Sequence, residues 1–118
     1  MESKAVGRNL RISPMKLRKV INMIRGKSVL EAVYILKNLP NKAARIALKV
    51  LNSAVANFKQ ISGEIKPDSA SLKVSKVFVN QARVLKRIMP RARGRADVLR
   101  KQSSHLFIMI EEKAKVER

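Results

Sequence analysis

The side chains with the clearest chemical potential lie between positions 83 and 101, where the sequence reads RVLKRIMPRARGRADVLRK. This stretch holds many basic side chains against a single acid, Asp97; the basic ones are Arg83, Lys86, Arg87, Arg91, Arg93, Arg95, Arg100 and Lys101. Most are arginines, whose planar guanidinium binds a phosphate through two parallel hydrogen bonds. The stretch therefore predicts binding to a phosphate-bearing polyanion.

The composition of the whole chain supports the same ligand. Its 118 residues include 27 Lys and Arg against 8 Asp and Glu, which gives a formal net charge of +19. So many like charges repel one another in a compact state, and a polyanion relieves that repulsion. Nucleic acid is the partner that we expect, and an anionic membrane surface is the second candidate.

Several kinds of catalytic site are excluded. The chain has no cysteine, so disulfides, thiolate metal sites and cysteine nucleophiles are absent. His105 is the only histidine and lies in a strand-like run, which favours a structural or RNA-contacting role. Neither a P-loop nor a GxGxxG motif occurs. We expect no enzyme activity, no metal and no cofactor.

The hydropathy pattern gives no sign of a membrane protein. No apolar run approaches the roughly 20 residues that a helix needs to cross a bilayer. The first residues, MESKAVGRNLRIS, have no apolar signal core. We expect a soluble cytoplasmic protein.

The elements around the basic stretch are strand-like and indicate how it is held. Residues 73–79 (KVSKVFV) precede it and residues 104–110 (SHLFIMI) follow it, while Pro90 and Gly94 mark a reversal near its middle. We predict a β-hairpin arm over about 81–102, which projects from a body formed by about 1–80 and 103–118 of one domain. A reversal centred near Ala92 would place Phe78 opposite His105 and Val74 opposite Met109.

The rest of the body is predicted to hold one more strand and three helices. Residues 4–12 form the strand, with Val6, Leu10 and Ile12 on one face and a bend or close backbone approach at Gly7. Ser13 caps a first helix that Gly26 ends. A capping box, Ser28 to Glu31, opens a second helix that runs to Pro40, and Asn41 opens a third that ends near Ser62. The third helix also carries basic residues on its outer face.

Residues 64–118 outside the arm carry fewer signals. Residues 64–71 are predicted to form a polar loop. Over residues 72–79 the apolar side chains alternate with polar ones but change phase between Val74 and Val77, which predicts a bulge near Ser75 and Lys76. Residues 111–118 show no periodicity and are predicted to fray. The sequence predicts an α+β fold: three helices packed on a three-stranded antiparallel sheet, with a long protruding basic β-hairpin.

An isolated two-stranded ribbon is marginal in water, so we expect the arm to be mobile alone and ordered when bound. If its eight cations all contact phosphates, the affinity should fall as salt rises, with a log–log slope of about −5 to −7.

The arm has no aromatic residue, which argues against a base-stacking platform for single strands and favours recognition of folded RNA by its shape and backbone. A merely solvated loop is the plainer alternative, but matched strands flank this run.

Two rival classes remain open at this point. A histone-like architectural DNA binder also combines helices with a basic, proline-tipped β-arm, but it works as an intertwined dimer. A cationic membrane-surface protein needs a helix with large apolar residues opposite a basic face. The alanine-rich third helix fits close packing better than bilayer insertion.

Three stretches resemble one known family. RISPMKLRKVINMIRGKSVLEA, KVLNSAVAN and MPRARGRADVLRKQSSHL are similar to large-subunit ribosomal protein twenty-two in its bacterial or organellar form, over about residues 4–110. The resemblance implies a structural, non-catalytic protein of the large ribosomal subunit that binds its rRNA, supports assembly and helps line the nascent-peptide exit tunnel with its arm. It also implies neighbouring ribosomal proteins and the nascent peptide as partners, and, together with the closed core, a monomer when free. Bacterial cytoplasm or an organelle would be the location.

The resemblance also carries residue assignments. The expected rRNA-binding residues are Lys4, Arg8, Arg11, Lys16, Arg18, Lys19, Arg25, Lys27, Arg83, Lys86, Arg87, Arg91, Arg93, Arg95, Arg100, Lys101 and His105. The expected tunnel-lining residues are Leu85, Lys86, Arg87, Met89, Pro90, Arg91, Ala92, Arg93, Gly94 and Arg95. One departure is Asn57-Phe58-Lys59-Gln60, where the family more often has a small residue followed by Glu-His.

Overall fold

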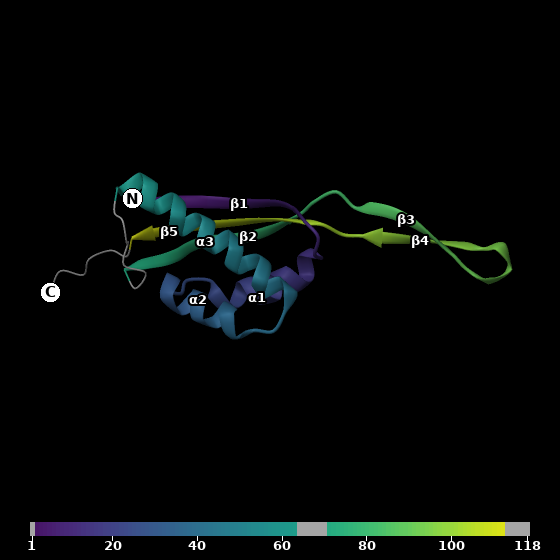
Figure 1. Cartoon of the computed structure of the whole chain (residues 1–118), viewed down its shortest axis with the longest axis horizontal. Helices are drawn as coiled ribbons and strands as arrows, with labels where there is room; N and C mark the ends of the chain where they lie inside the picture. The colour runs from purple at the N-terminus through teal and green to yellow at the C-terminus, as the bar shows by residue number, and fades with distance from the viewer. Residues whose placement is uncertain (1, 64–70, 113–118) are drawn as a thin grey trace.

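A computed structural model of the chain describes residues 2–63 and 71–112, and Figure 1 shows its two parts. The body is a sheet with helices over one face, and a two-stranded ribbon extends from the end of that sheet. The whole measures 73 × 24 × 21 Å, and its radius of gyration is 17.8 Å. A compact domain of this length would have a radius near 13 Å, so the ribbon projects well beyond the body. The α+β class is confirmed.

The three helices begin and end close to the predicted positions. They are α1 (Pro14–Ile24), α2 (Val29–Asn38) and α3 (Lys42–Ser62). The Ser13 hydroxyl accepts a hydrogen bond from the Lys16 backbone N–H, and the Ser28 hydroxyl accepts one from the Glu31 N–H. Both bonds satisfy N–H groups that the first turn of a helix leaves unpaired. Gly63 ends α3 in the left-handed conformation.

The body sheet consists of β1 (Glu2–Leu10), β5 (Ser104–Glu112) and β2 (Leu72–Gln81), in that spatial order and antiparallel throughout. The last strand of the chain is therefore the central one. Glu111 pairs with Glu2 and with Lys73, so the prediction that fraying begins at Glu111 was wrong. Residues 113–118 and 64–70, on which the other tail and loop predictions fall, lie outside the described residues.

The buried face of β1 differs from the prediction. Ser3 and Ala5 face the core, whereas Val6 is 46% exposed on the opposite face. The pairing with β5 shifts between Gly7 and Leu10, and Asn9 adopts a left-handed φ of 53°. This irregularity changes the phase of the strand, so Leu10 packs against the core although Val6 does not.

The predicted close approach at Gly7 is present. A Cβ at this position would lie 2.9 Å from Cγ2 of Val50 on α3, and 3.1 Å from Cδ1 of Leu10. Only a glycine allows β1 and α3 to pack at this distance.

The bulge in β2 is confirmed, because its register with β5 shifts between Val74 and Lys76. The predicted partners are wrong by one or two residues. Phe78 lies opposite Phe107 rather than His105, and Val74 lies opposite Ile110 rather than Met109. The reversal turns about Arg93 instead of Ala92, since a three-residue turn, η1 (Ala92–Gly94), forms the tip.

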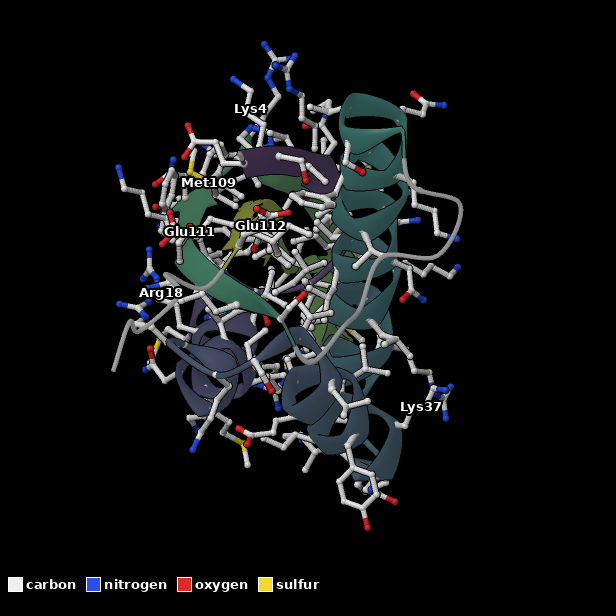
Figure 2. The ribbon with its side chains drawn as sticks, turned by 90° about the vertical axis from the view of Figure 1, so that its left-hand side faces the viewer. Lys4, Arg18, Lys37, Met109, Glu111 and Glu112 are labelled. Atoms are coloured by element: carbon white, nitrogen blue, oxygen red, sulfur yellow. The ribbon has the colours of Figure 1, made fainter. Side chains whose placement is uncertain are left out.

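The core lies between the sheet and the helices and is built from the predicted stripes. Its largest fully buried side chains are Phe58, Leu17, Ile21, Ile24, Leu36, Leu51, Leu72, Leu106, Ile108, Ile110, Val29 and Val74. Alanines of α3, including Ala44, Ala47 and Ala54, are also fully buried. Small side chains there let the helix backbone approach β1 and β5. The helices cover one face of the sheet and leave the other face open (Figures 1 and 2).

The arm is a separate two-stranded ladder of β3 (Leu85–Pro90) and β4 (Ala96–Lys101). The two segments that connect the body sheet to the arm run side by side, and the Ala82 N–H donates to the Ser103 carbonyl at 2.9 Å. Every residue of β4 and all of β3 except Leu85 are exposed. The arm consequently has no core beneath it.

Candidate nucleic-acid interface

All eight basic residues of the arm are exposed. The ladder places Lys86 opposite Arg100, and Leu85 opposite Lys101, on alternate faces of the ribbon. Cations therefore lie on both faces rather than forming one stripe. A ribbon of this kind can contact polyanion on more than one side.

The tip is a tight turn that presents arginines. The Arg91 N–H donates to the Arg95 carbonyl at 2.6 Å, and Arg93 adopts a left-handed φ of 62° next to Gly94. The Arg91 Nε forms an ion pair with Asp97 Oδ2 at 2.8 Å. Both partners are more than half exposed, so this pair adds little stability. It does orient Arg91 across the hairpin, while Arg93 and Arg95 extend from the turn.

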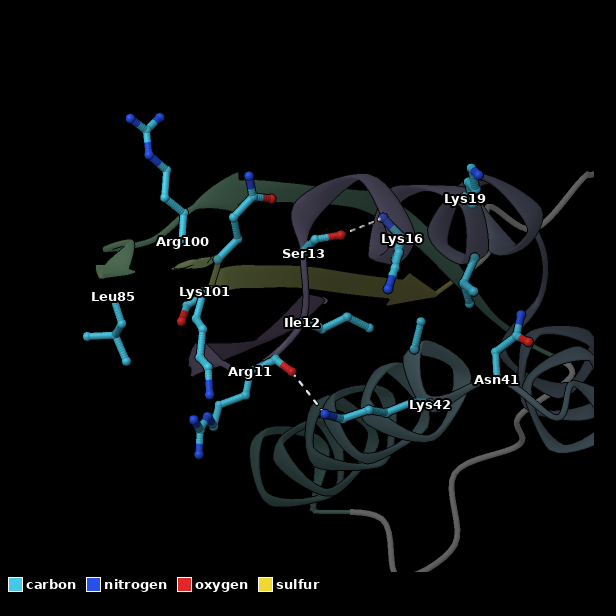
Figure 3. Close-up of a pocket in the computed structure, with 14 residues that line it drawn as sticks. Arg11, Ile12, Ser13, Lys16, Lys19, Asn41, Lys42, Leu85, Arg100 and Lys101 are labelled. Carbon is cyan, nitrogen blue, oxygen red and sulfur yellow. Dashed lines mark hydrogen bonds between the residues drawn. The ribbon is translucent and has the colours of Figure 1, made fainter. Parts of the chain in front are cut away.

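A groove of about 840 Å³ lies where the arm joins the body, and Figure 3 shows its lining. Six cations line it: Arg11, Lys16, Lys19, Lys42, Arg100 and Lys101. They come from three regions that are distant in the chain: residues 11–19, which cover the β1–α1 segment and the start of α1, the first residue of α3, and the end of β4. No acid is among the described residues that line the groove.

The groove has a defined local geometry. The Lys42 Nζ donates to the Arg11 carbonyl at 3.0 Å, and Ser13 caps α1 at the groove wall (Figure 3). A concave surface lined by charge of one sign concentrates its electric field and attracts counter-ions. A phosphate backbone is the counter-ion that this groove suits.

Sequence reasoning missed part of this groove. Lys42, Asn41 and Gln102 line it but were not predicted as binding residues. The basic outer face of the third helix was the available signal for Lys42. Only the folded chain brings that helix terminus beside β4.

Arg18 and Arg25 serve the body as well as the predicted interface. Arg18 donates to the Val79 carbonyl and Arg25 to the Val77 carbonyl, each at 3.0 Å. These carbonyls lie on the free edge of β2, which α1 covers. A guanidinium has five N–H donors, so each arginine keeps donors for another ligand.

The remaining predicted residues lie on the body surface. Lys4 and Arg8 are exposed on β1, and Lys27 is exposed while its carbonyl accepts the Val74 N–H at 2.9 Å. His105 is half-buried, and its Nδ1 accepts the Asn9 N–H at 3.1 Å. That bond holds the irregular end of β1, which supports the structural interpretation of His105.

Within residues 2–63 and 71–112, no cluster of three or more His, Cys, Asp or Glu side chains is placed to hold a metal ion. In the same described part of the chain, no helix has the length and apolar character needed to cross a membrane.

A small α+β body whose cationic groove continues into an exposed basic ribbon is the arrangement of a structural protein with a surface suited to a polyanion. The family model described as ribosomal protein L22p/L17e matches residues 5–111. The chain belongs to this family, whose members are structural proteins of the large ribosomal subunit and not enzymes.

Individual relatives agree along almost the whole chain. The chain is 48% identical to large ribosomal subunit protein uL22 of Fusobacterium nucleatum, over 93% of this chain and 96% of the relative. It is 45% identical to the protein of the same name from Desulforamulus reducens, over 96% and 97% of the two chains. For the Thermotoga protein the identity is 49%, over 98% of this chain and 70% of the relative.

Proposed function

We propose that this chain binds large-subunit ribosomal RNA through its groove and arm together, and that it supports assembly of the subunit. We further propose that the arm helps line the nascent-peptide exit tunnel. The observation that carries the first proposal is the groove, because six cations from three separate regions of the chain converge there and no acid is among its described lining residues.

The body and the arm have different tasks in this proposal. The groove anchors the RNA backbone at the root of the arm, through Lys16, Lys42 and Arg100 among others. Each strand of the arm adds six residues, a length of about 20 Å at strand rise. The exposed tip then extends into the particle, where RNA encloses it. Residues from Leu85 to Arg95 would contact tunnel-wall RNA and the passing peptide.

Salt titration of binding to large-subunit rRNA tests the first part. The wild-type chain should lose affinity steeply as salt rises, because cation–phosphate contacts release counter-ions. Lys42→Ala should reduce the log–log slope by about one unit, as for a lost phosphate contact. Lys59→Ala, on the same helix but outside the groove, is the matched control. A wild-type slope near zero would contradict RNA-backbone binding as the main role.

Site-specific crosslinking tests the tunnel assignment. A photoreactive side chain at Arg93 of the tip should crosslink to the nascent peptide in stalled, translating ribosomes. The same group at Tyr34, which is exposed on α2 of the body, should not. Peptide crosslinks from position 34 without any from position 93 would reverse the proposed orientation.

A further inference from the structure

One face of the body sheet is left uncovered by the described residues and carries an aromatic pair. The helices pack on the other face, where Leu106 and Ile108 of β5 are fully buried. On the open face, Phe78 and Phe107 stack with ring centroids 4.6 Å apart and an interplanar angle of 15°. These are two of the four aromatic residues in the chain.

The pair belongs to a row that crosses all three strands. Val6 of β1 lies opposite Phe107 of β5, which lies opposite Phe78 of β2. Phe107 is therefore enclosed by a neighbour on each side. Phe78 is on the edge strand and is 43% exposed. Within residues 2–63 and 71–112, no further strand lies beside its outer ring face.

Arginines bracket Phe78 at that edge. Arg25 is bonded to the carbonyl of Val77 and Arg18 to the carbonyl of Val79, the residues on either side of Phe78. The bonds hold both guanidiniums at the free edge and leave N–H donors unused. Figure 2 shows Arg18 on the same side of the molecule as Lys4 and Met109 of the open face.

The charged side chains nearest the row are positive. Lys4 and Lys76 lie opposite Met109 in the adjacent row, on either side of it. Among the described residues, the acids of this face are Glu2 and Glu111, which pair with each other at the end of the strands away from the Phe78 row. Glu111 also forms an ion pair with Lys73 at 3.2 Å.

We propose that the open sheet face is a second ribosomal-RNA contact, at which an unpaired nucleobase stacks on the outer ring face of Phe78. The base would extend the Val6–Phe107–Phe78 row by one member, and the phosphates beside it would meet Arg18, Arg25 and Lys76. Base–aromatic stacking with cationic neighbours is the usual chemistry of single-strand contacts. An apolar protein partner would instead bury these cations without counter-charges, which is costly.

This inference rests on the proposed RNA-binding function and adds a contact that the arm does not provide. The arm has no aromatic residue and so offers no ring on which a base could stack. The fold creates a site for one base elsewhere, because β2 and β5 bring Phe78 and Phe107 together.

The test compares substitutions that keep or remove the aromatic ring. Full-length chain is titrated with transcribed large-subunit rRNA at several salt concentrations. Phe78→Leu should bind about tenfold more weakly, as for one lost stack, with the salt slope unchanged. Phe78→Tyr should stay within about twofold of wild type, because the ring is retained. Tyr34→Leu, which removes an exposed aromatic from α2, should have no effect.

The possible outcomes distinguish failure of the proposed stacking site from failure of the proposed RNA-binding function. Steep salt-dependent binding by wild type together with unchanged binding by Phe78→Leu would overturn the stacking site alone. A wild-type chain without salt-dependent binding would overturn the proposed function itself. If Phe78→Leu weakens incorporation only when other ribosomal proteins are present, and binds naked RNA normally, the face docks a protein and our proposal is wrong.

A second measurement does not depend on any variant folding. Ultraviolet irradiation of the wild-type complex should link a nucleotide to the peptide that contains Phe78, identified by mass spectrometry. Linkage confined to arm peptides would count against the site.

Discussion

Gly7 lies where β1 passes against α3, and its role is one of packing. Because a Cβ here would approach the stiff, β-branched Val50 to 2.9 Å, Gly7→Ala should destabilise the protein by about 1–2 kcal/mol. The measurement is the free energy of unfolding from denaturant titration.

A double-mutant cycle gives the control for this prediction. In a Val50→Ala background the added methyl gains room, so most of the cost of Gly7→Ala should disappear, with a coupling energy of about 1 kcal/mol. Equal costs in both backgrounds would show that packing against Val50 is not the cause.

At the residue scale, patterns alone predicted Gly7 correctly and Val6 incorrectly. A glycine inside a strand signals a close approach whatever its neighbours are. The facing of Val6 depended on the irregularity near Asn9, which shifts the pairing with β5. Gly7 indicated a bend or a close approach, but no residue-type pattern in the first strand determines how the pairing shifts or which side chains it turns toward the core.

The contact between α1 and the edge of β2 leads to a prediction at the element scale. Arg18→Met and Arg25→Met keep the apolar stem but remove the donor to a strand carbonyl. Each should lower the free energy of unfolding by about 1 kcal/mol, a value reduced for partial exposure. Thermal or denaturant unfolding measures this.

Lys19→Met on the same helix is the matched control. Lys19 lines the groove, so this variant should weaken RNA binding without lowering stability. Equal losses of stability in all three variants would mean that the loss reflects removal of charge from α1 rather than of the edge bonds.

The arm provides the second element-scale prediction. In free protein, amide hydrogens of β3 and β4 should exchange rapidly, while those of β5 should be protected, because only β5 is paired on both sides over a buried core. Adding large-subunit rRNA should slow exchange in the arm. Strong protection of residues 85–101 without RNA would contradict this.

Helices and their caps could be predicted because their signals are local. Ser13, Ser28 and Gly63 act within one turn of their own helix. The double role of Arg18 could not be predicted, since a basic residue off the apolar stripe looks the same whether solvent or a strand edge lies beside it.

At the scale of the whole molecule, the shape predicts hydrodynamic behaviour. The chain closes its core with its own helices and extends to 73 Å. Sedimentation velocity should give a single species with the mass of one chain and a frictional ratio well above that of a sphere. An obligate dimer would instead favour the histone-like arrangement of two arms.

The groove is the clearest example of a feature that depends on contacts between segments distant in the chain. Its cations lie in three distant regions of the chain, and β5 has to insert between β1 and β2 before the arm can start beside α1 and α3. The distance along the chain between these segments hides their convergence. The same insertion places Phe107 opposite Phe78. The sequence had predicted His105, two residues away, as the partner of Phe78.

The sequence by itself determined the excess of positive charge, the helices with their caps, and the basic hairpin with its glycine- and proline-marked tip. Composition and short-range periodicity carry those features, and neither depends on which segments become neighbours. Tertiary structure decided the facing of β1, the register around Arg93, the groove at the root of the arm and the aromatic row on the open sheet. Each of these depends on strand order and on one-residue shifts in pairing, and a single such shift turns a side chain from the core to the surface.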